Sequence, residues 1–320
     1  MHLTRIFIFL LAIAAIAVST ASCITQPWVH AAESADAQVE VAALERHVRS
    51  LAEDFQPRSV ENPAQLQAAG DYVLAQMRAS GAAPEIQIVD VNGSRYRNFI
   101  ARFGPAEGAL LVIGAHYDAC GQTPGADDNA SGVAGLLELA RLLAQAPPPR
   151  PVELVAYTLE EPPYFRTDSM GSFWHARELE RQGRKVRLMV SLEMIGYYRD
   201  TPGSQSFPVA GMGLLYPDAG NFIAVVGAWR DFGSMRRIKA LFMGASDLPA
   251  VTVNAPESVT GVDFSDHASY WRFGMPAVMV TDTAFLRNPN YHEAGDTAAT
   301  LDYARMAKVV RAMHAVAMQF

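Results

Sequence analysis

Cysteine is scarce in this sequence, which has only Cys23 and Cys120 among its 320 residues. If Cys23 is removed with a leader segment, one thiol remains, and no disulfide within the chain is expected even in an oxidising compartment. No base motif is dedicated to Cys120, which argues against a nucleophilic role. We therefore expect Cys120 to be a packed thiol.

Clusters of basic residues and internal repeats are also missing. The formal net charge is −7, with 33 acidic and 26 basic residues, which argues against a nucleic-acid partner. The composition, 50% hydrophobic and 18% charged, suits one large α/β domain with a substantial core. No linker points to a second catalytic domain, so we expect a single domain over residues 40–320.

An apolar run long enough to span a membrane comfortably is absent from the N-terminal segment. Arg5 is followed by the apolar run Ile6 to Val18, which is short for a span but suits the apolar region of an export signal. We expect residues 1–22 to be that signal, residues 23–39 to be a tether, and the protein to be periplasmic, secreted or lipid-anchored. Three processing positions stay open: small-residue sites ending at Ala21 and Ala31, and a lipoprotein-like box ending at Cys23 that would supply a membrane anchor.

Apolar periodicity and turn signals outline the elements of this domain. The sequence Asn92-Gly93-Ser94 is a turn signal between two strand-like segments and indicates a hairpin. A hairpin feeding an otherwise parallel sheet gives a mixed, mostly parallel sheet, in a three-layer αβα sandwich. The expected helices are 41–55, 63–79, 133–143, 169–182 and 301–318, and the expected strands are 85–91, 96–103, 109–115, 151–159, 186–192 and 276–281.

Histidines and carboxylates follow four of these apolar strands, at the points where the strands end. In an open α/β sheet, ligands bind in the crevice outside the carboxyl ends of the strands, so segments distant in sequence can converge there. The sequence therefore predicts one pocket with two histidines and at least four carboxylates. The side chains concerned are His116, Asp118, Asp127, Asp128, Glu160, Glu161, Glu193 and His292.

So many neighbouring carboxylates would raise one another's pKa unless cations neutralise them. Metal ions supply that neutralisation directly. A set of imidazoles and carboxylates favours zinc or a similar divalent ion, with manganese or cobalt as alternatives where oxygen ligands dominate. Two ions suit the number of ligands.

Each of these motifs also has an ordinary structural explanation when it is taken alone. Asp128-Asn129-Ala130-Ser131 precedes a helix and has the residue types of an N-cap. Glu160-Glu161 has the character of a solvated turn, and His292 that of a surface loop residue. The combination, with each chemical type supplied at the end of a strand, favours the metal site.

These residues resemble the co-catalytic di-zinc exopeptidases, a family that includes secreted bacterial leucyl aminopeptidases and, more remotely, the glutaminyl cyclases. The resemblance implies the αβα fold of zinc exopeptidases and two zinc ions per chain. It implies an aminopeptidase that hydrolyses peptides with a free N-terminus by means of a water molecule activated by the metals. Carried over by position, His116 and Glu193 would bind one zinc, Glu161 and His292 the other, Asp128 would bridge both, Glu160 would be the general base, and Tyr291 would donate to the oxyanion.

Two further acids are expected to support the ligands. A metal-bound imidazole normally donates its other N–H to a carboxylate, and Asp118 is placed for that role beside His116. Asp127 is expected to lie outside the ligand set. For Asp266, in the family-like sequence Ser265-Asp266-His267, a supporting role and simple helix capping both stay open.

The sequence departs from the family pattern at two places. Glu193 stands where aspartate is usual, which puts the number of metals in question. The residues after Glu160-Glu161 are also unusual, and Tyr164 to Arg166 would reshape the cleft wall, as would an insertion over residues 196–220.

Two other functions would use related scaffolds. A one-zinc glutaminyl cyclase would use the same scaffold, but its pattern has tryptophan and serine where this chain has Tyr291 and Asn129. A metal-free binding relative would have lost ligands or the general base, whereas this chain keeps all five ligands together with Glu160.

Overall fold

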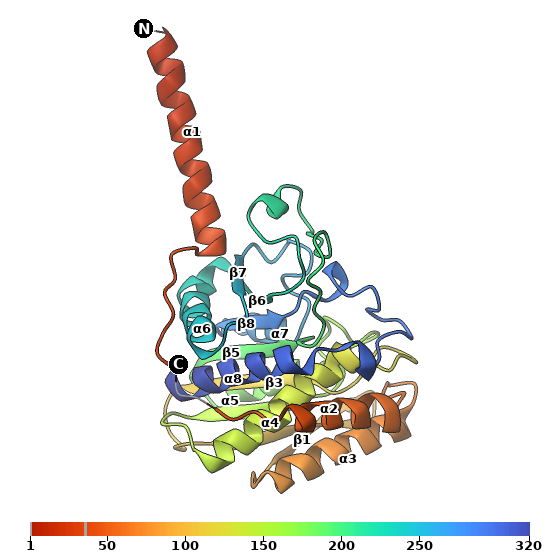
Figure 1. Cartoon of the computed structure of the whole chain (residues 1–320). Helices are drawn as coiled ribbons and strands as arrows, with labels where there is room; N and C mark the ends of the chain where they lie inside the picture. The colour runs from red at the N-terminus through yellow and green to blue at the C-terminus, as the bar shows by residue number, and fades with distance from the viewer. Residues whose placement is uncertain (1, 35–36) are drawn as a thin grey trace.

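A mixed sheet forms the centre of the protein (Figure 1). The computed structural model describes residues 2–34 and 37–320, and the side chains of 2–8, 14 and 17 are not described. Position 1 of the expected signal and positions 35–36 of the expected tether therefore lie outside the described residues. The described residues form an eight-stranded sheet in the order β1-β2-β4-β3-β5-β8-β6-β7. Its strands are β1 (Glu85–Val91), β2 (Ser94–Phe103), β3 (Leu110–His116), β4 (Val152–Tyr157), β5 (Val186–Glu193), β6 (Ile223–Gly227), β7 (Ala250–Asn254) and β8 (Ala277–Thr281).

Most neighbouring strands of this sheet are parallel, as the sequence predicts. β4, β3, β5 and β8 lie side by side and run in the same direction. β1 and β2 form the expected hairpin, and Asn92 and Gly93 both have positive φ, as in the two-residue turns that match strand twist. β2 is antiparallel to β4, and β6 is antiparallel to β8. The four parallel strands bring their carboxyl ends to one edge of the sheet.

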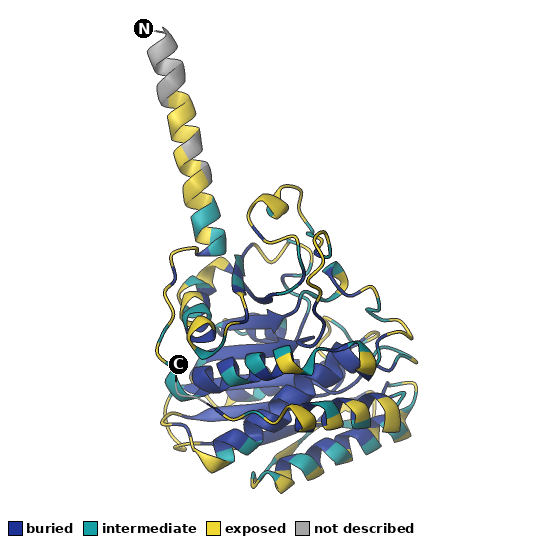
Figure 2. Ribbon diagram, viewed as in Figure 1, coloured by how far each residue is buried: buried dark blue, intermediate teal, exposed yellow. Residues whose placement is uncertain are grey.

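Helices cover both faces of the sheet and complete a three-layer sandwich. One apolar cluster joins one face to α2, α3, α4, α6 and α8, and a second joins the other face to α5 and α7. Figure 2 shows the central strands buried, with the exposed residues on the outer sides of the helices. The helices are α1 (His2–Thr25), α2 (Val41–Arg49), α3 (Pro63–Ala79), α4 (Gly132–Gln145), α5 (Gly171–Arg181), α6 (Phe232–Ala245), α7 (His267–Trp271) and α8 (Tyr303–Gln319).

The central strands follow directly from the apolar runs of the sequence. Every residue of β3, β4 and β8 is buried, which is expected of strands covered by helices on both faces. The strands β6 and β7 are not among the elements expected from the sequence. The first expected helix, 41–55, is α2 continued by a π-helical turn, Ser50–Asp54.

The N-terminal helix α1 projects away from the sandwich (Figure 1). The apolar side chains described between positions 9 and 18 are exposed, Phe9 and Leu11 by more than half, so they do not belong to the core. Among the described residues, no helix combines the length and apolar character that crossing a membrane requires. The chain that follows packs on the domain, because Gln26 and Val29 are buried and the Ala32 amide donates to the Ala240 carbonyl.

Candidate metal centre

Four central strands deliver the predicted side chains to one edge of the sheet. His116 is the last residue of β3 and Glu193 is the last residue of β5. Glu160 and Glu161 follow β4 after two residues, and His292 lies in the loop after β8. All but His292 are nearly inaccessible to solvent. The edge therefore carries a compact group of imidazoles and carboxylates.

Asp128 lies between the two histidines. Its Oδ1 is 3.4 Å from Nε2 of His116, and its Oδ2 is 3.1 Å from Nε2 of His292. Glu193 Oε2 lies on the first side, 3.4 Å from Nε2 of His116. Glu161 Oε2 lies on the other side, 3.2 Å from Nε2 of His292. The extra methylene of Glu193 does not prevent its carboxylate from joining the group.

These spacings fit the ligands of tetrahedral divalent ions. Zinc bonds to nitrogen and oxygen of about 2.0 to 2.1 Å place the ligand atoms of one ion about 3.3 Å apart. Both ring nitrogens of His116 are buried without a hydrogen-bond partner in the part of the chain that the structure describes. The same is true of Glu161 Oε1. Buried polar atoms normally have partners, so their absence here indicates a group that an ion would complete. Glu160 Oε2 is farther away, 3.9 Å from Nε2 of His116.

The pKa values of the group are those of carboxylates and imidazoles that share protons. Burial, reinforced by Asp128, raises the pKa of Glu161 to about 7. Burial also raises the pKa of Glu160 well above its usual range, despite the opposing charge of His116. Burial lowers the pKa of His292, but its hydrogen bonds to Asp128 and Glu161 outweigh burial and raise it. A divalent ion would displace these protons, because metal ligands bind as neutral imidazoles and ionised carboxylates.

Each adjacent pair of acids is fixed by another carboxylate that accepts from two consecutive amides. Asp118 accepts hydrogen bonds from the amides of Glu160 and Glu161, at 3.2 and 3.1 Å. Its Oδ1 is also 3.5 Å from Nδ1 of His116. Asp296 likewise accepts from the amides of Asp127 and Asp128, at 2.9 and 3.1 Å. The main chain at both acid pairs is therefore held in place independently of any bound ion.

Helix capping does not account for Asp128. Asn129 is the residue that meets the start of α4, because its Oδ1 accepts from the Gly132 amide at 3.1 Å. The same oxygen accepts from the Met194 amide, and the Asn129 side chain donates to the Leu192 carbonyl. Asn129 thus ties the start of α4 to the end of β5 and leaves the Asp128 carboxylate facing the histidines.

The sequence Ser265-Asp266-His267 lies against the same group. Ser265 Oγ donates to Glu193 Oε2 at 2.7 Å. Asp266 precedes α7 but makes no side-chain cap, so the capping interpretation of this residue is wrong. Burial raises the pKa of Asp266 to about 7, with the charges of His116 and Glu193 close enough to affect it. Both oxygens of the Asp266 carboxylate are buried without a hydrogen-bond partner among the described residues.

Three buried residues near the site, Asp282, Asp296 and Arg58, are not among the residues that the sequence predicts. The Asp282 carboxylate accepts from the Tyr197 and Ala284 amides, beside Asp127. Asp296 has the contacts described above, and its place four residues after His292 was the only signal for it. Arg58 is fully buried, and its side chain donates to four main-chain carbonyls, which nothing in its local sequence indicates. Those carbonyls belong to Leu51, Tyr117, Pro124 and Gly125.

Asp127 lies outside the ligand group, as the sequence predicts, whereas the prediction that Cys120 is a packed thiol is wrong. Asp127 Oδ1 and Oδ2 accept from the Gly196 amide and the Asn288 side chain, and neither is placed between the histidines. Cys120 is only half-buried and lies beside Glu161 and His292, so it is not a thiol packed in the core. The loop after β3 surrounds the Arg58 side chain, which donates to the carbonyls of Tyr117, Pro124 and Gly125. Cys120 lies within this loop, beside the site.

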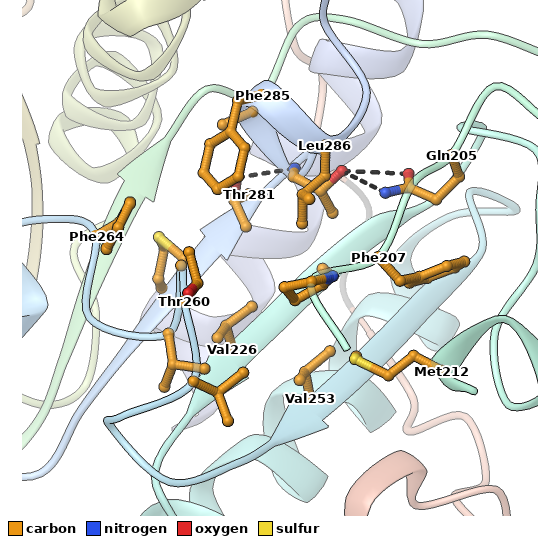
Figure 3. Close-up of a pocket in the computed structure, with 18 of the residues that line it drawn as sticks. Gln205, Phe207, Met212, Val226, Val253, Thr260, Phe264, Thr281, Phe285 and Leu286 are labelled. Carbon is orange, nitrogen blue, oxygen red and sulfur yellow. Dashed lines mark hydrogen bonds between the residues drawn. The ribbon is translucent and has the colours of Figure 1, made fainter. Parts of the chain in front are cut away.

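An apolar pocket adjoins the metal group (Figure 3). Glu193 and Tyr291 belong to its lining, and the Tyr291 ring stacks on His292 with the ring centres 3.9 Å apart. Part of its wall comes from residues 205–216, within the insertion that the sequence places along the cleft. The labelled apolar residues of the wall are Phe207, Met212, Val226, Val253, Phe264, Phe285 and Leu286.

The unusual residues after Glu161 reach the wall of this pocket. Phe165 packs on Phe264, with ring centres 5.6 Å apart. Arg166 pairs with Asp263 and lies over the Phe264 ring, 4.7 Å from its centre. Residues 165–166 therefore position one side of the pocket.

The comparisons with known proteins show a peptidase family. The profile of peptidase family M28 matches residues 98–317. The protein YfbL of Escherichia coli is 50% identical over 293 residues, which cover 89% of this chain and 90% of YfbL. Leucine aminopeptidase 1 of the fungus Uncinocarpus reesii is 28% identical over 65% of this chain, and this chain spans about half of that enzyme (51%).

Solved structures with the same fold include two kinds of enzyme. The LapA aminopeptidase of Legionella pneumophila has a TM-score of 0.69 at 18% identity, over 88% of this chain and 73% of LapA. A glutaminyl cyclase of Bacteroides thetaiotaomicron has a TM-score of 0.66 at 18% identity, over 89% of this chain and 100% of the cyclase. At this identity the likeness shows the shared fold.

Proposed function

We propose, from the premise that this chain belongs to peptidase family M28, that it is an aminopeptidase with two zinc ions. The family is zinc-dependent, and its aminopeptidases act on peptides. One observation carries the proposal for this chain: the two oxygens of Asp128 face Nε2 of His116 and Nε2 of His292, as a carboxylate shared by two ions would. We assign His116 and Glu193 to one ion and Glu161 and His292 to the other.

Zinc at this position would supply a Lewis acid that polarises the scissile carbonyl and makes water a better nucleophile at neutral pH. Glu160 is the proposed general base, because it lies beside the ligands but farther from His116 than they do. It would accept the proton of the attacking water and return it to the leaving amine. The Glu160 amide donates to Asp118, and this hydrogen bond fixes the main chain that carries the Glu160 carboxylate.

Tyr291 is the proposed donor to the carbonyl oxygen as negative charge develops on it. Burial raises the pKa of Tyr291, and the surrounding carboxylates, Asp128 first among them, raise it further. The phenol therefore keeps its proton at neutral pH and remains a donor. A donor fixed before the reaction stabilises a developing oxyanion without reorganising.

The charge of the site favours a substrate with a free α-ammonium group. Five acids are gathered at the edge of the sheet: Asp118, Asp128, Glu160, Glu161 and Glu193. The side chain of the nearby cation Arg58 donates to main-chain carbonyls. An acidic cleft with low-dielectric walls attracts positively charged groups. The apolar pocket beside Glu193 and Tyr291 would then take the side chain of the first residue, so we propose a preference for apolar N-terminal residues.

Paired peptides test this function. We expect a leucine-initiated peptide to be shortened stepwise from its N-terminus, and the same peptide with an N-terminal acetyl group to survive, because acetylation removes the positive charge. An aspartate-initiated peptide should be cleaved much more slowly than the leucine one, since the described lining of the pocket includes no lysine, arginine or histidine to pair with its carboxylate. Mass spectrometry of the digests at successive times measures all three outcomes.

A glutamine-initiated peptide is the control for the related activity in this fold. Loss of ammonia from that peptide without shortening would mark a glutaminyl cyclase and overturn the aminopeptidase assignment. Early internal fragments from the acetylated peptide would instead mark an endopeptidase.

We also propose that the chain is exported and processed before Cys23. The apolar side chains described between Phe9 and Val18 are exposed, so loss of residues 1–22 removes none of the described core residues. Residues after Cys23 pack on the domain: Gln26 and Val29 are buried, and the Thr252 hydroxyl donates to the Thr25 carbonyl. Cleavage after Ala31 would remove that packed segment, whereas cleavage before Cys23 would preserve it.

The mature N-terminus tests the export proposal. Intact-mass analysis of the protein from a bacterial host should show loss of residues 1–22, with added lipid mass on Cys23 if the chain is anchored. In the Cys23→Ser variant the lipid mass should vanish. A full-length, cytoplasmic chain would contradict export.

A further inference from the structure

The loop after β3 places a thiol on the His292 side of the metal group. Sγ of Cys120, a carboxylate oxygen of Glu161 and a ring nitrogen of His292 all lie within 4.8 Å of one another. The sequence has no other cysteine besides Cys23. Cys120 is half-buried, so it is in contact with the site and also open to small molecules.

Hydrogen bonds to the main chain of the loop fix the position of Cys120. The Thr123 amide and hydroxyl both donate to the Cys120 carbonyl, at 3.0 and 2.7 Å. The preceding Ala119 amide donates to the Arg58 carbonyl. Arg58 in turn donates to the carbonyls of Tyr117, Pro124 and Gly125, on both sides of the cysteine. This buried arginine thus fixes the turn that presents the thiol.

A second observation at the same place points to an ion. Glu161 Oε1 is buried and has no hydrogen-bond partner within the described ranges, although the side chain is only 5% exposed. Its Oε2 is 3.2 Å from Nε2 of His292. A carboxylate that leaves one buried oxygen without a partner is costly unless a cation completes it.

We propose that Cys120 is a fourth protein ligand of the ion assigned to Asp128, Glu161 and His292, an inference that rests on the proposed metallopeptidase function. The thiol would lose its proton to solvent as the sulfur binds the metal. Four protein ligands close a tetrahedral zinc site, whereas catalytic zinc keeps one position open. The other ion has only His116, Asp128 and Glu193. The two positions would then differ: the thiolate site would hold its ion more tightly and prefer softer metals, and the His116 site would keep the open position.

Cobalt substitution tests this ligand directly, because a thiolate bound to cobalt(II) gives an intense near-ultraviolet charge-transfer band that carboxylates and imidazoles do not give. We expect the band to grow over the first equivalent of cobalt added to the metal-free full-length protein, and to change little over the second. Cys120→Ser, which keeps the size and replaces sulfur with oxygen, should lose the band. Cys23→Ser is the matched control and should keep it.

Alkylation of Cys120 provides a second measurement that does not depend on a variant folding. In wild-type protein, bound zinc should slow the modification of Cys120 by iodoacetamide at least several-fold, as peptide mass mapping would show. Two bound cobalt ions without a charge-transfer band, a band that persists in Cys120→Ser, or equal alkylation with and without zinc would each overturn the proposal. If such a protein still hydrolysed peptides in a metal-dependent way, only the thiol ligand would be lost. Failure to bind cobalt at all would overturn the proposed function as well.

Discussion

Replacing Glu160 with glutamine is expected to lower the rate constant for peptide hydrolysis by about 100-fold or more while leaving the metal content unchanged. Glutamine has the same shape but cannot accept the proton of the attacking water. The backbone at this position is fixed by Asp118, so the substituted side chain should keep its place. Glu160 Oε2 is also 3.9 Å from Nε2 of His116, against 3.4 Å for the assigned ligand Glu193. Steady-state kinetics and metal analysis of the same preparation measure both quantities.

The same chemical change elsewhere provides the control. Glu178 pairs with Arg181 near the C-terminal end of α5 and is outside the group of proposed ligands, so Glu178→Gln should leave the rate unchanged. If Glu160→Gln instead lost one metal ion, Glu160 would be a ligand. An unchanged rate would exclude it as the base.

The positions of the ligands could be predicted because strand ends are visible in this sequence. β3, β4, β5 and β8 are apolar runs that stop at polar residues, and covered parallel strands produce that pattern. The rule that ligands bind at the carboxyl edge then brings His116, Glu161 and Glu193 together without any knowledge of strand order. His292 was harder, because it lies in a loop eleven residues beyond β8, so the strand end alone places it less closely, and the family resemblance supported its return to the edge.

The groups that hold the ligands could not be predicted in the same way. Asp296 and Arg58 act on main-chain amides and carbonyls of distant loops, and such contacts leave no spacing pattern in the sequence. The thiol of Cys120 illustrates the same limit. Its neighbours in sequence suggest a packed residue, whereas its position depends on a turn that Arg58 organises from 62 residues earlier in the chain.

The acidic character of the site explains why metal removal should have the largest effect on activity. Without ions, Glu161 and the histidines retain protons, as the raised pKa values of Glu161 and His292 indicate. The protonated groups cannot polarise a carbonyl as a divalent ion does. Hydrolysis by the chelated and dialysed protein is therefore expected to fall to the background rate.

Metal content and hydrolysis measured together on one protein sample test the central claim most directly. The sample is treated with chelator, dialysed, and then titrated with zinc, with bound zinc and cleavage of a leucine-initiated peptide recorded at each step. We predict two zinc ions per chain at saturation, no cleavage before zinc is added, and full recovery as the second ion binds. Full cleavage by the metal-free protein would contradict the account, and so would saturation at a single ion.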